Sequence, residues 1–321
     1  MKKILITGGC GFIGSHLVEF FLKKKQKVVV FDKKGKRYEK NWLKNFKHKN
    51  LKIILDDIRN YNKLDKIIKN CSQVIHLAAA ISIPHSYLYP REHVSINILG
   101  TLNVLESCKK HKKSCIITST SETYGSGKYF PMDENHPLNA QSPYAATKIS
   151  ADQLALSYYN SFGLKVKIIR PFNCFGPRQS TRAVIPTMIM QLIKDPTEIK
   201  IGNTNTFRDY TYVEDLCSAF WLLSKSKKGF GKIFNIGTNK AHKIKDILYL
   251  LKKISKAKSI IKVDKKRFRP SKSEVNKLHC DNKNFLKLFK WKPSNFNNKL
   301  VDTFNWYKNN SKLFNASKYN F

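Results

Sequence analysis

Two short segments near the middle of the chain carry side chains that could move protons. Thr120 and Glu122 lie in Thr-Ser-Glu-Thr-Tyr-Gly (120–125), and Tyr144 and Lys148 lie in Tyr-Ala-Ala-Thr-Lys (144–148). On a helix, residues four apart are neighbours at about 5–6 Å between Cβ atoms. The pKa of a free tyrosine is about 10, and a cation on the same face favours the phenolate and lowers that pKa. The pair therefore predicts proton transfer through Tyr144, coupled to hydride transfer.

Glu122 adds a second possible base to this group. A carboxylate two residues after Thr120 indicates that a proton on carbon is removed as well as one on oxygen. General bases of this type act when they lie within hydrogen-bond reach of the proton that they take. The alternative is that Glu122 is a solvated carboxylate in a loop.

A glycine-rich turn close to the N-terminus predicts a bound dinucleotide. Gly8, Gly11 and Gly14 follow a predicted strand and open a helix that starts near Phe12, with Ile13 next in line. Glycines at such a turn let backbone N–H groups approach a pyrophosphate, which the N-terminus of the helix also attracts. We expect these five residues to contact the cofactor.

An acidic residue indicates which dinucleotide binds. Asp32 ends the second predicted strand, 18 residues after Gly14, where a carboxylate hydrogen-bonds the ribose hydroxyls of the adenosine. A 2′-phosphate would be repelled there, so Asp32 favours NAD, although Lys33 and Lys34 leave room for NADP. Residues that follow the third and fourth predicted strands complete the expected cofactor site: Asp57, Ile58, Leu77, Ala78 and Ala79.

Apolar runs that alternate with helical patterns must position these groups. Seven runs read as buried strands: residues 3–6, 27–31, 52–55, 73–77, 114–118, 165–169 and 232–236. This alternation predicts an α/β fold, a Rossmann-type doubly wound parallel sheet with helices on both faces. After Pro171 the alternation stops, so we expect a smaller substrate-binding lobe. The predicted NAD-binding domain comprises residues 1–170 and 212–240, and the lobe comprises 171–211 and 241–321.

The helix that carries Tyr144 has clear predicted ends. Ser142 suits the N-cap, Pro143 the first turn and Gly163 the stop. An apolar stripe of residues spaced four apart predicts the face that packs on the core or, alternatively, on a second subunit: Leu154, Tyr158 and Phe162.

The composition excludes several classes of protein. The formal net charge of +38 comes from lysines scattered along the whole chain, without the interleaved aromatic residues of a nucleic-acid module. No apolar run is long enough for a membrane span, and the N-terminus lacks the pattern of a signal peptide. Seven cysteines without a Cys-x-x-Cys pair indicate reduced thiols and no zinc site. We therefore expect a cytoplasmic protein that binds neither nucleic acid nor metal.

Motifs along nearly the whole chain resemble the extended short-chain dehydrogenase/reductase family. They include Thr-Gly-Gly-Cys-Gly-Phe-Ile-Gly (7–14), Arg-Pro-Phe-Asn-Cys-Phe-Gly-Pro-Arg (170–178) and Arg-Asp-Tyr-Thr-Tyr-Val-Glu-Asp (208–215). The resemblance implies a nucleotide-sugar enzyme that binds NAD tightly. It also implies that the enzyme forms a homodimer through two long helices. It further implies that Thr120 and Tyr144 meet the sugar 4-hydroxyl and that Lys148 holds the nicotinamide ribose.

Within this family, glutamate at position 122 is typical of 4,6-dehydratases and glucuronate decarboxylases, whereas 4-epimerases usually carry a small residue there. Segments 176–187 and 267–275 look like the dehydratases of nonulosonate pathways, which act on nucleotide-linked N-acetylglucosamine. Ser121 replaces the aspartate of dTDP-glucose dehydratases, which leaves the acid for the departing hydroxyl open. By the resemblance, the substrate-binding residues are Ser121, Asn173, Arg178, Arg182, Val184, Ile185, Arg208 and Arg269.

These observations predict a nucleotide-sugar 4,6-dehydratase that acts on GDP- or UDP-N-acetylglucosamine and regenerates its NAD in each cycle. A 4-epimerase or a UDP-glucuronate decarboxylase of the same fold is the alternative. A regulatory protein that binds NAD without chemistry would typically lose the tyrosine or the lysine, and this chain has both Tyr144 and Lys148.

Overall fold

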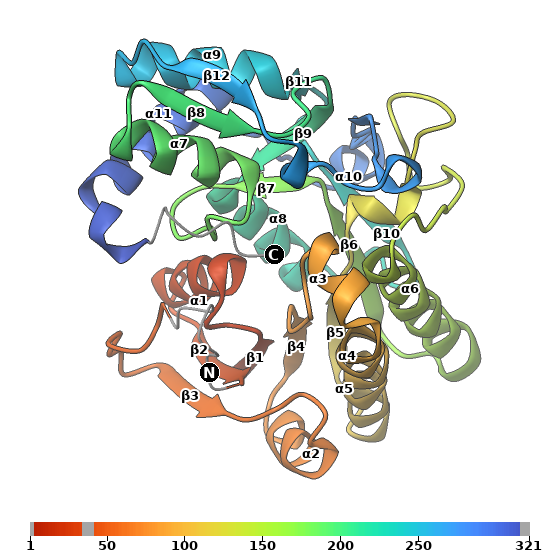
Figure 1. The fold of residues 1–321 in the computed structure, drawn as a ribbon. Helices are drawn as coiled ribbons and strands as arrows, with labels where there is room; N and C mark the ends of the chain where they lie inside the picture. The colour runs from red at the N-terminus through yellow and green to blue at the C-terminus, as the bar shows by residue number, and fades with distance from the viewer. Residues whose placement is uncertain (1–2, 34–41, 315–321) are drawn as a thin grey trace.

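The computed structural model describes residues 3–33 and 42–314, and a seven-stranded parallel sheet lies at its centre (Figure 1). All seven predicted strands form, and every neighbouring pair is parallel. In spatial order the strands are β10 (Ile233–Ile236), β6 (Val166–Pro171), β5 (Ser114–Thr118), β4 (Gln73–His76), β1 (Lys3–Thr7), β2 (Lys27–Asp32) and β3 (Leu51–Leu55). The strand order reverses at β1 and β4, where doubly wound sheets bind their ligands at the carboxyl edge.

Successive residues of each strand feed two different cores. Ile4 and Ile6 of β1 pack with helices α1 (Phe12–Lys23) and α8 (Val213–Lys225), whereas Leu5 packs on the opposite face. That second face is covered by α2 (Tyr61–Lys69), α5 (Gly100–Lys110) and α6 (Pro143–Phe162). The Rossmann-type fold is therefore confirmed, and its inner strands are mostly apolar because both of their faces are buried, whereas the edge strand β3 is only partly buried.

The segment between β4 and α5 consists of short helical pieces. Helix α3 (Ile83–Leu88) is followed by α4 (Pro90–His93) and a π-helical segment, Val94–Leu99, that runs into α5. A 3-10 turn, Ser121–Tyr124, follows β5 and carries Glu122. Both segments lie close to α6, so they place their side chains around the residues of its first turns.

A second body of structure covers the carboxyl edge of the sheet, at the top of Figure 1. Its strands are β7 (Asn173–Phe175), β9 (Phe207–Tyr212), β11 (Ala241–Lys243) and β13 (Lys277–Leu278) in one sheet, and β8 (Glu198–Ile201) and β12 (Ile260–Val263) in another. Its helices are α7 (Val184–Lys194), α9 (Ile244–Ser255) and α11 (Phe296–Asn309), which share one apolar core. Three further 3-10 turns are Lys265–Arg267, Ser271–Ser273 and Ser311–Leu313.

One part of the C-terminal region packs elsewhere. Phe285 of helix α10 (Lys283–Leu288) packs in the core beneath the large sheet. Trp291, which follows this helix, packs in the same core. Residues 241–321 thus do not all pack in the smaller lobe, and the domain boundaries stay a prediction. Among the described residues, no helix combines the length and apolar composition needed to cross a bilayer.

Helix α6 begins and ends where the sequence predicts. The Ser142 hydroxyl accepts a hydrogen bond from the backbone N–H of Ala145 at 3.1 Å, and Gly163 ends the helix with a φ of 63°. The predicted apolar stripe is only partly buried. Tyr158 is 8% exposed, but Phe162 is 57% exposed because it lies in the last turn, past the core beneath the helix.

Candidate active site

A cavity of about 920 Å³ lies at the carboxyl edge of the sheet, beneath the smaller lobe. It brings together all four predicted catalytic residues and every residue that was expected to contact the cofactor. Of the predicted substrate-binding residues it is lined by Ser121, Asn173, Arg178 and Arg182. The side chains come from segments more than a hundred residues apart in the sequence.

The glycine turn forms a close-packed cradle at one end of the cavity. Gly8 has a φ of 69°, and a Cβ atom there would lie 2.7 Å from the backbone nitrogen of Ala78. A Cβ atom on Gly14 would lie 2.1 Å from the carbonyl oxygen of Gly8. Helix α1 opens after Gly11 without a side-chain cap, so its first N–H groups suit a phosphate. This cradle fits a dinucleotide pyrophosphate.

Asp32 is held beside the cradle by the backbone. The N–H of Cys10 donates to Oδ2 of Asp32 at 2.7 Å, which fixes the carboxylate at the end of β2. Asp57 also lines the cavity, but Arg59 donates to both of its carboxylate oxygens, at 2.8 and 2.6 Å. Asp32 is therefore the better placed of the two carboxylates to accept hydrogen bonds from ribose hydroxyls.

Tyr144 lies deep in the cavity and is bonded to Thr120. Burial raises the pKa of its phenol well above the usual range, and the neighbouring carboxylates Glu122 and Asp152 raise that pKa further. The Thr120 hydrogen bond lowers the pKa but does not offset burial. Burial therefore outweighs this hydrogen bond, and the lowering of the pKa by the charge of Lys148, which proton transfer through Tyr144 requires, stays a prediction.

Lys148 is buried one turn further along α6. Its Nζ donates to the carbonyl oxygen of Thr118 at 2.6 Å, so the ammonium group reaches the end of β5. Burial lowers the pKa of Lys148 to about 8, while the carboxylate of Asp152 raises it. Because this pKa is still above neutral pH, Lys148 carries its charge there in most molecules.

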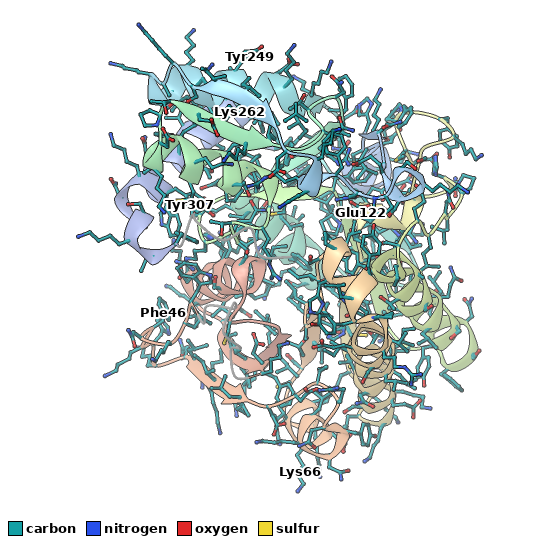
Figure 2. The ribbon with its side chains drawn as sticks, in the orientation of Figure 1. Phe46, Lys66, Glu122, Tyr249, Lys262 and Tyr307 are labelled. Carbon is teal, nitrogen blue, oxygen red and sulfur yellow. The ribbon has the colours of Figure 1, made fainter. Side chains whose placement is uncertain are left out.

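Glu122 faces the cavity rather than bulk solvent. Its side chain is only 13% exposed, and one carboxylate oxygen lies 3.7 Å from Nη1 of Arg269. Its charge also acts on the titration of Tyr144 and of Arg208. The alternative of a solvated loop carboxylate is thus wrong (Figure 2 labels Glu122 at the meeting of the two bodies).

The predicted substrate arginines fall into two groups. Arg178 and Arg182 line the cavity, where Nη2 of Arg178 pairs with Glu19 at 2.7 Å. Arg208 and Arg269 instead lie near Glu122, outside the cavity lining. Arg208 is 6% exposed and donates to the carbonyl oxygen of Phe207 at 2.9 Å.

Two further predicted substrate contacts lie outside the cavity lining, as Arg208 and Arg269 do. Ile185 is 1% exposed and packs in the core of the smaller lobe with Met188 and Ile189, so its contact with substrate stays a prediction. Val184, beside it at the start of α7, packs against the same core and is also outside the cavity lining. By contrast, Oδ1 of Asn173 is a buried acceptor at the cavity that makes no hydrogen bond within the described part of the chain.

The sequence reading missed two residues that contact the catalytic group. His93 is fully buried, its ring stands at 84° to that of Tyr144 with centroids 6.0 Å apart, and its Nε2 lies 3.1 Å from Nδ1 of His85. Asp152, two turns after Tyr144, pairs with Arg170 at 2.8 Å. Only the four-residue spacing of Asp152 from Lys148 could have pointed to it; nothing in the sequence marks His93.

Comparison with known proteins gives matches over nearly the full chain. The family model described as GDP-mannose 4,6 dehydratase matches residues 5–303. A putative UDP-glucose 4-epimerase from Methanocaldococcus jannaschii is 32% identical and covers 96% of this chain and 99% of its own. A UDP-N-acetyl-alpha-D-glucosaminuronate decarboxylase from Bacillus cytotoxicus is 34% identical over 77% of this chain and 78% of its own.

Among solved structures, a dTDP-glucose 4,6-dehydratase from Streptomyces venezuelae, crystallised with NAD, superposes with a TM-score of 0.89. It is 25% identical and covers 98% of this chain and 100% of its own. The chain is thus similar to three proteins that are named for three different activities: an epimerase, a decarboxylase and a dehydratase.

Proposed function

The chain belongs to the NAD-dependent epimerase/dehydratase family, the extended short-chain dehydrogenases/reductases, and from this premise we propose that it is a nucleotide-sugar 4,6-dehydratase. The proposed substrate is GDP- or UDP-linked N-acetylglucosamine. The product would be the corresponding 4-keto-6-deoxy sugar, formed with net loss of one water molecule.

NAD is the cofactor that the cradle suits. The glycine turn would hold its pyrophosphate and Asp32 its adenosine ribose, with Lys148 near the nicotinamide ribose. When bound, NAD supplies the acceptor and then the donor of the hydride that moves from C4 to C6. The chain's own residues handle the protons.

Tyr144, hydrogen-bonded to Thr120, would take the proton of the C4 hydroxyl as C4 becomes a ketone. The ketone acidifies the C5 proton, which Glu122 removes, and the C6 hydroxyl then departs. The departing hydroxide needs one proton, from Glu122 or from water, because Ser121 offers no acid at that position. As the hydride returns to C6, C5 takes back one proton, so the two protons removed, from the C4 hydroxyl and from C5, balance the two returned, to the departing hydroxide and to C5. One water leaves in all.

The position of Glu122 is the observation that carries this proposal. Glu122 is 13% exposed, lines the same cavity as Tyr144 and acts on the titration of its phenol, which supports its assignment as the base for C5 beside the C4 that Tyr144 serves. A 4-epimerase needs no such base, because it only removes a hydride from C4 and returns it. The decarboxylase alternative shares the glutamate and is supported by the Bacillus cytotoxicus relative.

Mass spectrometry of the products separates the three activities. The purified protein is incubated with GDP- and UDP-N-acetylglucosamine and, in parallel, with the matching glucuronates. We expect loss of one water from an N-acetylglucosamine substrate. An isobaric product would instead establish an epimerase, and loss of carbon dioxide from a glucuronate would establish a decarboxylase. Either result overturns the proposal.

The homodimer stays a prediction that sedimentation can test. A single species of twice the chain's 37.2 kDa mass at micromolar concentration would support it.

A further inference from the structure

The last described residues of the chain form part of the cavity wall. Lys312, Leu313 and Phe314 line the cavity together with Trp42, which follows β2 in the large body. These residues lie some 270 positions apart in the sequence, and neither the glycine turn nor the Tyr/Lys pair predicts them. Leu313 is 45% exposed although it is apolar. A ligand bound in the cavity can cover this apolar surface.

Four aromatic side chains join the segment after β2 to helix α11 and the turn that follows it, and we call them the aromatic clasp: Trp42, Trp306, Tyr307 and Phe314. The ring of Trp42 lies 5.8 Å from that of Trp306 and 6.1 Å from that of Phe314. Phe314 also contacts Trp306 at 5.9 Å and Tyr307 at 5.0 Å. Aromatic pairs at these distances stabilise each other beyond the area that they bury.

The clasp is attached to the cofactor cradle on one side. The backbone N–H of Trp42 donates to the carbonyl oxygen of Cys10 at 3.2 Å. The N–H of Cys10 in turn donates to Asp32, the carboxylate at the predicted adenosine ribose. Trp42 is therefore two hydrogen bonds away from the group that selects the dinucleotide.

The other side of the clasp is attached to the smaller lobe. The hydroxyl of Tyr307, a residue that is fully buried in α11, donates to the carbonyl oxygen of Gln179. Gln179 lines the cavity and donates from Nε2 to the carbonyl oxygen of Cys174 at 2.8 Å. The clasp thus spans the cavity from the cradle to the loop that carries Arg178 and Arg182.

We propose that the aromatic clasp and the adjoining Lys312–Leu313 wall hold the adenosine half of NAD in place and make the dinucleotide a resident cofactor. The wall and Asp32 line the same cavity, Trp42 is linked to Asp32 through Cys10, and the ring contacts of Trp42 connect the two bodies. Dissociation of NAD then requires the ring contacts of Trp42 and Phe314 to open. A retained cofactor suits a reaction that returns its hydride to the sugar in every cycle, and this link rests on the proposed function.

Release of NAD from the loaded protein tests the clasp without any turnover. The variants Phe314→Ala and Trp42→Ala are loaded with NAD, passed through a desalting column, and sampled for free NAD over time by chromatography. We expect each variant to release NAD about tenfold faster than the unmodified protein, because Trp42→Ala loses two ring contacts and Phe314→Ala loses three. Tyr249→Ala is the matched control, an exposed ring on α9 outside the cavity (labelled at the top of Figure 2), and should release NAD at the unmodified rate.

A more conservative change keeps the test valid if the alanine variants unfold. Phe314→Leu retains an apolar side chain but lacks a ring, so its release rate should lie between those of the alanine variant and the unmodified protein. Unchanged release from Phe314→Ala, Trp42→Ala and Phe314→Leu overturns the clasp and leaves the dehydratase proposal standing. Failure of the unmodified protein to bind NAD at all would instead refute the cofactor assignment on which both depend.

Discussion

Glu122 lines the cavity with the guanidinium of Arg269 3.7 Å away, and its charge acts on the phenol of Tyr144. The isosteric change Glu122→Gln removes its basicity and leaves its shape. We expect NAD to be reduced by the sugar as before, because Tyr144 and Thr120 are unaltered, while product formation falls about 100-fold or more. Absorbance of the reduced cofactor after mixing follows the first event, and mass spectrometry follows the second.

Glu274 provides the matched control for this change. It lies 3.5 Å from Nη2 of Arg208, in the same neighbourhood, but outside the cavity lining. Glu274→Gln should therefore keep product formation within a few-fold of the unmodified rate. If Glu122→Gln turns over at the unmodified rate, Glu122 is not the C5 base.

His93 acts on Tyr144 through packing, since the two rings meet edge to face and no hydrogen bond joins them. We expect His93→Ala to lower kcat about tenfold with little change in KM, because the phenol loses the ring that fixes its direction. His93→Phe should restore most of kcat, since it returns an aromatic ring to the same space. Steady-state kinetics of both variants measure this, and an unchanged kcat in His93→Ala would refute the positioning role.

At the scale of the element, α6 presents Tyr144, Lys148 and Asp152 at four-residue intervals on one face. The charge of Asp152 raises the pKa of Lys148, whose value is about 8. In Asp152→Asn that contribution is lost, so Lys148 gives up its proton at lower pH. We expect the decline of kcat/KM on the alkaline side to begin at a lower pH in this variant, as a pH–rate profile would show.

Asp152 also neutralises Arg170, which is buried and bonded to it at 2.8 and 3.0 Å. Breaking such a buried pair costs about 3–5 kcal/mol, so the profile must be recorded well below the melting temperature of the variant. Ser119→Ala is the matched control: it removes a 2.7 Å hydrogen bond to Asp152 but leaves the charge. In Ser119→Ala, kcat/KM should begin to fall at the same alkaline pH as in the unmodified protein. If kcat/KM of Asp152→Asn also begins to fall at that pH, the electrostatic account is contradicted.

The sequence predicts the elements of the large sheet well because burial on both faces leaves unbroken apolar runs, such as Val28–Phe31. The ends of all seven strands lie within two residues of the prediction. The smaller lobe gave no such signal: β13 has two residues and pairs with β9 some 70 positions earlier. Strands this short depend on their partners for stability, so their own residues do not mark them.

At the scale of the whole molecule, the sequence identifies the cradle and the catalytic group but not the wall opposite them. Gly8, Asp32 and Tyr144 belong to local motifs with a fixed spacing, whereas Trp42 and Phe314 meet only because the chain folds back on itself. The burial of Ile185 in the core of the smaller lobe was not predicted, for a related reason. A helix with apolar residues on most sides does not reveal which of them faces the core.

The net charge of +38 gives a last prediction, which concerns the whole surface. A nucleotide sugar carries two phosphate charges, and a positive protein raises its local concentration through a field that salt screens. The screening length falls from about 10 Å at 0.1 M salt to about 3 Å at 1 M. We therefore expect KM for the nucleotide sugar to rise several-fold over that range while kcat stays nearly constant, because the chemistry occurs in a buried cavity.

An uncharged nucleoside, guanosine or uridine, provides the control for this salt series. As a competitive inhibitor it would fill the nucleotide site without phosphates, so its inhibition constant should be nearly independent of salt. Equal salt dependence for the nucleoside and the nucleotide sugar would mean that salt perturbs the cavity itself. A KM that does not change with salt would mean that the lysines, although numerous, lie too far from the entrance to act on the substrate. The charge would then be a property of the surface and not of the enzyme's function.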